Sequence, residues 1–268
     1  MYPWRRILLP TDFSTASEWV FDDAVRLAGS TDAELVILHI RMTHRSNPTE
    51  LRLPADPSLY DYAEQYELDR LRKRVENAQE DIPTRLIVRT APDPGNEIGR
   101  AAAEEKADLI VIATHARHHV AHLIIGSTTL AVMQTPPAPV LAIRYGIRKR
   151  SGMKRILVPV HPQQASRAAL DLATAIVARE GGEIRLLTVC YESDRDLAAS
   201  HLEQLAGALA PLDAKQELVV GNDVEREIVR YADRLEADAV FLNAHTGTGK
   251  VKIDIIRAVG TPVMIVPA

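Results

Sequence analysis

Residues 113–131 of this 268-residue chain, ATHARHHVAHLIIGSTTLA, hold groups that could bind either a metal or a phosphate. Four histidines are spaced so that a helix would place their imidazoles on one side: His115, His118, His119 and His122. Imidazole nitrogen is a zinc ligand, and His118 with His122 is the candidate pair, which would need a further ligand from elsewhere. Gly126-Ser127 precedes a short apolar stretch, and backbone N–H groups at the start of a helix bind phosphate.

Unbroken apolar runs alternate with stretches of helical period, and this order determines where those groups lie. The runs predict strands buried on both faces of a parallel sheet, at residues 5–10, 33–40, 84–90, 107–114 and 138–144. The stretches between them predict helices at residues 14–30, 60–80, 96–106 and 126–134. The first helix begins with a capping serine and ends near Gly29, and Pro136-Pro137 ends the last one.

Alternating strands and helices predict a doubly wound α/β sheet, because crossovers between parallel strands are right-handed. Such sheets bind ligands beyond the carboxyl ends of their strands, where the strand order reverses. Three groups should meet there: Pro10-Thr11-Asp12, His39-Ile40, and Ala113 to Ala116. That crevice is the expected binding site.

The chain contains this unit twice. RILLP (6–10) returns as RILVP (155–159), and KADLIVIATHA (106–116) returns as EADAVFLNAHT (236–246). The polar segment 144–155 reads as a linker. We therefore expect two domains, residues 1–146 and 153–268, each with a five-stranded doubly wound sheet.

Composition excludes several classes of protein. The formal net charge of −4, from 32 basic and 36 acidic residues, provides no general attraction for nucleic acid or anionic lipid. The single cysteine excludes an internal disulfide and a thiolate metal cluster. With no apolar run of membrane-spanning length, we expect a cytoplasmic protein that binds neither nucleic acid nor membrane.

The sequence resembles a tandem universal stress protein with two UspA-like domains. The resemblance is carried by LLPTDFS after the first strand, LHI ending the second, KADLIVIATHA, the Gly-Ser step and PVL in the last strand. It implies an adenine-nucleotide alpha-hydrolase-like fold in each domain, ATP binding in many members, and pairing through the last strands. The chain would then be an intramolecular pseudo-dimer, and a homodimer of chains stays open.

The resemblance also implies a nucleotide site in the first domain. Asp12 would accept hydrogen bonds from the adenine or ribose, Pro10 and Ile40 would contact the base, and the N–H groups of Gly126, Ser127 and Thr128 would hold phosphate. The strand ends complete the expected set with Thr11, Ala113, Thr114, His115 and Ala116. Ala113 and Ala116 stand where ATP-binding members have glycine, which could weaken binding. Two plainer roles stay open: Asp12 as a turn residue capping the first helix, and Ser127 as an ordinary N-cap.

The second domain departs further from the pattern. His161 stands at the aspartate position, Asn243 and Thr246 stand at the glycine positions, and the Gly-Ser step is missing. GTGK (247–250) lacks the full phosphate-loop pattern. This domain is expected to have lost nucleotide binding and to serve as a surface for a protein partner.

Three functions compete at this point. The first is a regulator that binds ATP or AMP, with Mg²⁺ optional, and acts through contacts with an unknown protein. The second is a nucleotide-independent dimerising stress protein, and the third is a metal-binding module built on the histidines. No catalytic residue is assigned, and enzymatic activity would be slow ATP hydrolysis at most.

Overall fold

The protein, seen in a computed structural model, is described at residues 2–42, 57–77, 82–114, 125–147, 152–161, 167–209, 212, 214–244 and 249–267, with no side chains described at 57–60 and 249–250. Its first domain contains β1 (Arg6–Thr11), α1 (Thr15–Thr31), β2 (Glu34–Met42), α2 (Pro57–Asn77), β3 (Thr84–Ala91), α3 (Pro94–Glu104), β4 (Leu109–Ala113), α4 (Ser127–Gln134) and β5 (Val140–Ile143). Its second domain contains β6 (Arg155–Pro159), α5 (Ala168–Glu180), β7 (Glu183–Cys190), a 3₁₀ turn (Glu192–Asp194), α6 (Arg195–Ala208), β8 (Ala214–Val220), α7 (Val224–Leu235), β9 (Ala239–Asn243), α8 (Gly249–Ala258) and β10 (Val263–Val266).

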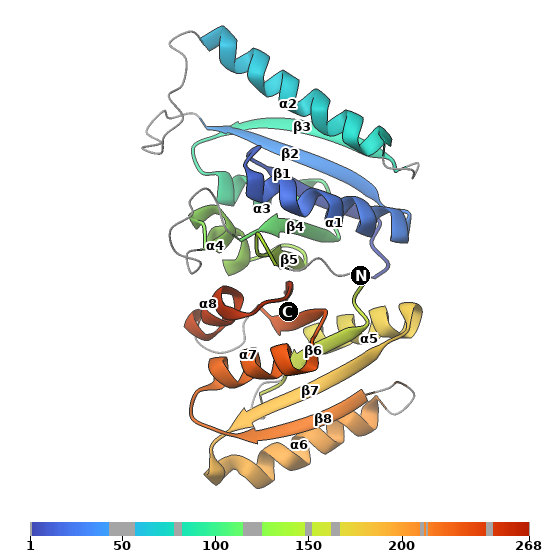
Figure 1. Cartoon of the computed structure of the whole chain (residues 1–268), viewed down its shortest axis with the longest axis vertical. Coiled ribbons are helices and arrows are strands. Elements are labelled where there is room, and N and C mark those ends of the chain that lie inside the picture. Colours follow the sequence, from blue (N-terminus) through green and yellow to red (C-terminus); the bar gives the residue numbers. More distant parts are fainter. Residues whose placement is uncertain are drawn as a thin grey trace.

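The strands form one ten-stranded sheet in the order β3-β2-β1-β4-β5-β10-β9-β6-β7-β8. Within each half all neighbours are parallel, and β5 pairs with β10 in antiparallel register, with Val140 opposite Ile265 and Ala142 opposite Val263. The two halves therefore stack end to end along the long axis of the molecule, with β5 and β10 at the middle (Figure 1). This arrangement confirms the predicted doubly wound domains and their internal pairing through the last strands.

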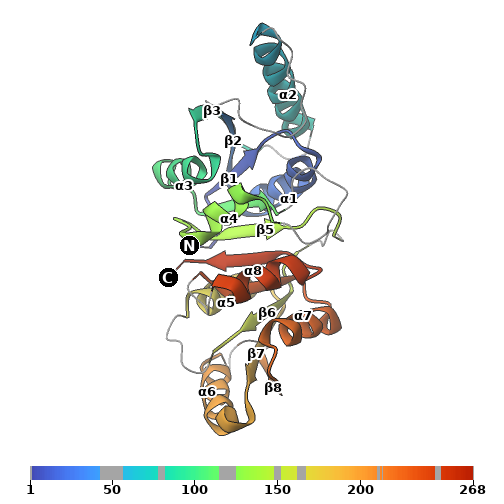
Figure 2. The ribbon, with the colours of Figure 1, turned by 90° about the vertical axis from the view of Figure 1, so that its left-hand side faces the viewer.

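Helices cover both faces of the sheet, and alternate residues of each strand point to opposite faces. Ile7 and Ile156 pack with residues of α1, α2, α5 and α6 in one core cluster. Leu8 and Leu157 pack with residues of α3, α4, α7 and α8 in the other. Figure 2 shows helices on both sides of the sheet in each half. Both cores draw on both domains, so burial of apolar surface stabilises the pair as one unit.

Helix ends differ from the prediction by a few residues, for local reasons. Helix α1 ends at Thr31 rather than near Gly29, because Asp32 takes the left-handed conformation and its N–H reaches the carbonyls of Ala28 and Gly29. Helix α3 starts early, at Pro94, because the Asp93 side chain accepts hydrogen bonds from the first N–H groups. None of the described helices is long and apolar enough to cross a bilayer.

An aspartate ties the start of each domain to its fourth strand. Asp108 Oδ2 accepts hydrogen bonds from the backbone N–H of Arg5 (2.8 Å) and Arg6 (3.1 Å). Asp238 Oδ2 does the same for Lys154 (3.1 Å) and Arg155 (2.8 Å). A carboxylate that accepts two backbone bonds aligns the first strand with the fourth, which are the two strands that frame the expected crevice.

We expect Asp108→Ala and Asp238→Ala each to lower the free energy of unfolding by about 1–3 kcal/mol, because each leaves two backbone donors without their charged acceptor. Urea denaturation checks this. Asp196→Ala, at an exposed position in the first turn of α6, is the matched control and should change stability by less than about 0.5 kcal/mol. Equal effects of all three substitutions would contradict the assigned role.

Candidate functional site

The strand order reverses between β1 and β4, and the turn after β1 is built by hydrogen bonds between residues close in the chain. Thr11 Oγ1 accepts from Phe13 N (3.1 Å), and Asp12 Oδ1 accepts from Ser14 N (3.0 Å). Ser14 Oγ accepts from Ser17 N (3.2 Å) and is the N-cap of α1. The N-cap of α1 is therefore Ser14, as the sequence predicted. Asp12 supports the turn before the helix, and its side chain is exposed.

Phe13 and His39 lie beside this turn, and the sequence did not single out Phe13. Phe13 has a positive φ of 58°, which is rare for a bulky residue and often marks functional sites. Its ring lies 4.3 Å from the His39 ring, tilted by 31°. His39 Nδ1 lies 2.9 Å from the Thr11 carbonyl oxygen, so Nδ1 must carry the proton.

Comparison with the second domain indicates a structural role for His39. There, Thr188 Oγ1 donates to the Val160 carbonyl (3.2 Å), at the positions that correspond to His39 and Thr11 in the repeat. Both side chains hold the end of the domain's first strand against its second. His39 thus belongs to the framework of the crevice.

Hydrogen bonds hold the start of α4 beside the end of β4. Gly126 N donates to the Thr114 carbonyl (3.2 Å), and Thr129 Oγ1 donates to the Ala113 carbonyl (2.8 Å). The N-cap is Gly126 (φ −62°, ψ 146°), so the reading of Ser127 as N-cap is wrong, because Ser127 is already the first helical residue. Within the part of the chain that the structure describes, no side chain caps this end. A Cβ added at Gly126 would meet no atom of the described residues within 4 Å, and these residues leave room beside the first N–H groups of α4.

The described part of the predicted site comes together at one edge of the sheet. Asp12 and Ser127 are exposed; Ile40, Ala113, Gly126 and Thr128 are half-buried; Pro10, Thr11 and Thr114 are buried. His115, Ala116, His118, His119 and His122 lie outside the described residues, so the histidine metal site stays a prediction. Within the described ranges, no group of three His, Cys, Asp or Glu side chains could hold a metal ion.

Helix α4 is positioned by α3 through a close approach at Gly95. An ideal Cβ at Gly95 would lie 2.5 Å from Ala131 Cβ and 3.2 Å from the Thr128 carbonyl oxygen. Only glycine permits this spacing without moving α4. The sequence signal was the Asp-Pro-Gly step at residues 93–95, which reads as a helix start and gives no hint of the neighbouring helix.

Ion pairs hold α3 against β3. Glu97 is buried, with 6% of its side chain exposed, and contacts Arg100 (2.6 Å) on its own helix and Arg89 (3.1 Å) on β3. The hydrogen bond from Arg100 is the main cause that lowers the pKa of Glu97 below its usual range; burial opposes it and Arg89 adds to it. The carboxylate is therefore retained in the folded state at neutral pH.

Larger side chains occupy the corresponding place in the second domain. Asn243, which corresponds to Ala113, accepts a hydrogen bond on Oδ1 from Ala169 N at the start of α5 (2.8 Å). Lys252 in α8 is buried, and its Nζ donates to the Ala244 carbonyl (2.8 Å). One backbone group beside the end of β9 and one at the start of α5 are thus bonded to side chains of the chain itself.

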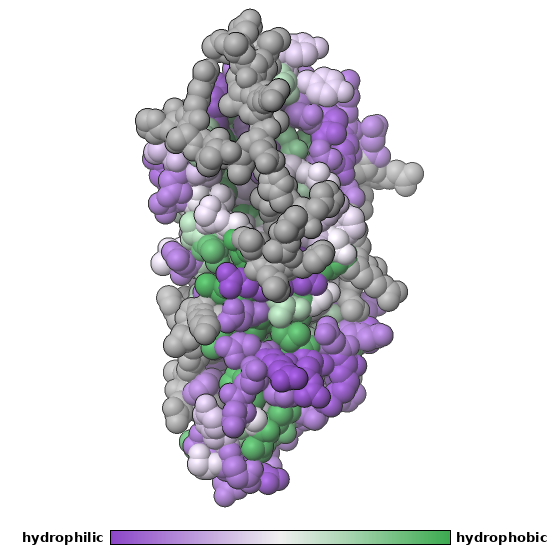
Figure 3. Space-filling view, turned by 60° about the vertical axis from the view of Figure 1, so that its left-hand side comes forward, coloured by the Kyte–Doolittle hydropathy of each residue, from purple (hydrophilic) through white to green (hydrophobic). Residues whose placement is uncertain are grey.

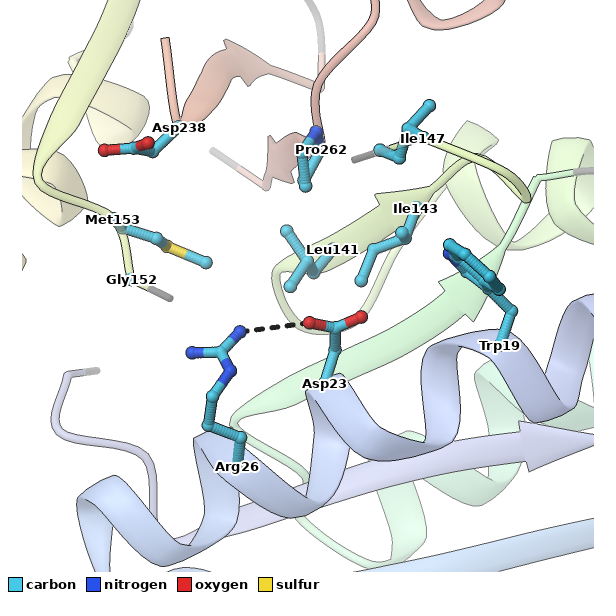
Figure 4. Close-up of a pocket in the computed structure, with 10 residues that line it drawn as sticks. All are labelled: Trp19, Asp23, Arg26, Leu141, Ile143, Ile147, Gly152, Met153, Asp238 and Pro262. Carbon is cyan, nitrogen blue, oxygen red and sulfur yellow. Dashed lines mark hydrogen bonds and ion pairs between the residues drawn. The ribbon is translucent and has the colours of Figure 1, made fainter. Parts of the chain in front are cut away.

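A separate groove lies at the domain junction on the α1 side (Figure 4). Its volume is about 380 Å³, including open solvent. Apolar side chains of β5 and the linker form part of its wall, and Asp23 with Arg26 contributes an ion pair of 3.1 Å. The groove does not include the strand ends described above. Its lining residues are Trp19, Asp23, Arg26, Leu141, Ile143, Ile147, Gly152, Met153, Asp238 and Pro262.

Comparison with known proteins gives one family for both halves. The model of the universal stress protein family matches residues 3–144 and 152–267. A universal stress protein of Methanocaldococcus jannaschii is 28% identical over 147 residues, which cover 53% of this chain and 82% of that protein. The crystal structure of a universal stress protein from Archaeoglobus fulgidus has a TM-score of 0.76 at 21% identity and covers 98% of this chain and 96% of its own. A Pseudomonas aeruginosa PAO1 protein of unknown function has a TM-score of 0.69 at 14% identity, covering 99% and 93%.

We expect Gly95→Ala to lower the free energy of unfolding by about 1–3 kcal/mol, because the added methyl overlaps Ala131 and displaces α4. The matched control is Gly99→Ala in the same helix, where a Cβ meets nothing within 4 Å. That change should be neutral or stabilise by up to about 1 kcal/mol, through helix propensity. Thermal unfolding of both variants tests this expectation. Destabilisation by Gly99→Ala, or no effect of Gly95→Ala, would refute the close approach.

We expect Glu97→Gln to lower the free energy of unfolding by about 1 kcal/mol at pH 7 and by less at pH 3. The folded-state pKa of Glu97 is lowered, so its contribution is present above the unfolded pKa and is lost as pH falls through the folded value. Urea denaturation at both pH values measures the difference. Glu203→Gln, at an exposed position of α6, serves as control; a Glu97→Gln effect independent of pH would contradict the ion-pair role.

Proposed function

Because the chain belongs to the universal stress protein family, we propose that its first domain, residues 1–146, binds an adenine nucleotide, ATP or AMP. One observation carries the proposal: among the described residues, no side chain caps the start of α4 and nothing lies within 4 Å of a Cβ built at Gly126, at the same sheet edge as Asp12. The first N–H groups of a helix and its positive end bind phosphate oxygens.

The arrangement supports a definite orientation for the ligand. The exposed Asp12 carboxylate, placed by its bond to Ser14, would accept hydrogen bonds from the ribose or adenine. Pro10 and Ile40 would contact the base, and the phosphates would reach Ser127 and Thr128. His115 and Ala116 complete the proposed site from the segment between β4 and α4. Mg²⁺ would accompany a triphosphate through its own oxygens, since the described residues offer it no cluster of ligands.

The second domain, residues 153–268, is proposed to provide contacts instead of a second nucleotide site. Asn243 already bonds the Ala169 N–H at the start of α5, and Lys252 already bonds the Ala244 carbonyl just after β9. Exposed apolar side chains, Tyr191, Leu197 and Val220, lie around the ends of β7 and β8. Among the described residues visible in Figure 3, hydrophobic side chains form small patches separated by hydrophilic ones. Such a mixed surface suits a reversible protein partner better than an obligate one.

A nucleotide-independent paired scaffold is the second candidate. The observation in its favour is the continuous sheet across β5 and β10, which gives a stable pair with no ligand. The Tyr2 hydroxyl adds a hydrogen bond to Glu180 of α5, so the chain's first residues also bridge the domains. The two candidates differ only in whether nucleotide binds.

Isothermal titration of the untagged protein with ATP, and separately with AMP, tests the proposal. We expect saturable heat for the wild type and at least about tenfold weaker binding for Asp12→Ala, a loss of about 1.4 kcal/mol. His161→Ala, at the corresponding position of the second domain, is the matched control and should bind like the wild type. Titration with and without Mg²⁺ shows whether the metal contributes.

Absence of heat from the wild type with either nucleotide would leave the scaffold as the function. Equal weakening by Asp12→Ala and His161→Ala would place the ligand elsewhere. Nucleotide released by denaturing fresh protein and identified by mass gives an independent readout that does not depend on the substitutions.

A further inference from the structure

Lys252 of α8 joins the two domains through its buried amine. Only 8% of its surface is exposed. Its Nζ donates to the carbonyl of Ala244, just after β9 in its own domain (2.8 Å), and to the carbonyl of Met133 in α4 of the first domain (3.2 Å). Helices α4 and α8 lie next to each other across the junction in both ribbon views (Figures 1 and 2).

The bond to Met133 acts on the carboxyl end of α4. Met133 is in the last turn of that helix, where carbonyls have no partner within the helix and the helix dipole is negative. An ammonium group has three donors and no acceptor, so two carbonyl oxygens partly replace its lost hydration. Burial lowers the pKa of Lys252, which reflects that cost. A cation from the second domain thus caps a helix of the first.

In the first domain, the residue at the equivalent position bonds to the end of its own strand β4. Thr129 and Lys252 each stand ten residues before the proline that precedes the last strand, Pro139 or Pro262. Thr129 Oγ1 donates to the Ala113 carbonyl at the end of β4 and remains within its own domain. Lysine at this position keeps a bond to the strand end and adds one across the junction.

Helix α4 would respond to groups bound at either end. It has eight residues, and a helix of that length is marginal without tertiary contacts. An anion at its amino end and a cation at its carboxyl end both stabilise it through the same dipole. A group that orders α4 at one end therefore favours the helical geometry that a bound group requires at the other end.

We propose that Lys252 is a positioning residue that couples the nucleotide site at the start of α4 to the β9 end and α8 of the second domain. The inference rests on the proposed nucleotide site. Nucleotide fixes α4, the Met133 carbonyl is then held in place for Lys252, and α8 is stabilised with it. Linkage requires the reverse as well: contacts that order α8 strengthen nucleotide binding.

Hydrogen exchange of backbone amides, followed by mass spectrometry with and without saturating ATP, tests the coupling in the full chain. In the wild type, ATP should slow exchange in α4 and in α8 by about fivefold or more, the lower end of usual coupling. Lys252→Met should keep the ATP effect in α4 and lose it in α8. Lys215→Met, at an exposed lysine of β8 paired with Glu183, is the matched control and should behave like the wild type.

Lys252→Thr is the second variant, because the first domain folds with threonine at this position and threonine is too short to reach Met133. It should also lose the ATP effect in α8. A purely structural role would instead speed exchange in α8 equally with and without ATP.

The outcomes separate the two proposals. ATP protection of α4 without protection of α8 in the wild type overturns the coupling and leaves the nucleotide site standing, as does α8 protection that persists in both Lys252 variants. No protection of α4 and no binding heat overturn both proposals together.

Discussion

The antiparallel pairing of β5 with β10 is the constraint on which the rest of the structure depends. Each domain alone would end in an open sheet edge at its fifth strand, and unpaired edges are costly to leave exposed. Pairing them satisfies the backbone groups and continues both cores across the junction. It also brings α4 beside α8, so that a side chain of one domain can reach the backbone of the other. The proposed coupling between the domains depends on this contact.

The two domains share their framework bonds and differ in the residues at the crevice. Asp108 and Asp238 hold the first strands in the same way, and His39 and Thr188 each hold a first-strand carbonyl. These bonds recur because the fold needs them in any copy. Two crevice residues do not recur, since Asp12 and Ala113 are replaced by His161 and Asn243. These positions can therefore change without loss of the fold, which fits the proposal that only the first domain binds nucleotide.

Sequence patterns were sufficient for the fold and insufficient for the contacts between its parts. Unbroken apolar runs indicate buried strands, and the resemblance to universal stress proteins implied that the last strands would pair. The Met133–Lys252 bond joins residues 119 apart in the chain, and no local pattern reports such a contact. Gly95 read as a helix start, whereas its role is to admit Ala131 of a neighbouring helix. Ser127 looked like a cap, because the sequence cannot show that Gly126 takes the non-helical conformation.

At position 113 the missing glycine matters less than the pattern suggested, whereas Ala116 lies outside the described residues. Ala113 lies within β4 and is not among the described non-glycine residues with positive φ, which are Phe13, Asp32, Lys106 and Glu236. Alanine in place of glycine adds one methyl group at this position, and that methyl removes no hydrogen-bond donor from the start of α4. In the second domain, by contrast, Asn243 and Lys252 bond backbone groups at the corresponding strand end and α5. Phosphate oxygens accept hydrogen bonds, so a phosphate in the second domain would have to compete with Asn243 for the Ala169 N–H, whereas at Ala113 it need only fit beside a methyl. Among the described residues, an occupied backbone N–H group, more than the count of glycines, is the difference that supports the proposed division of roles between the domains.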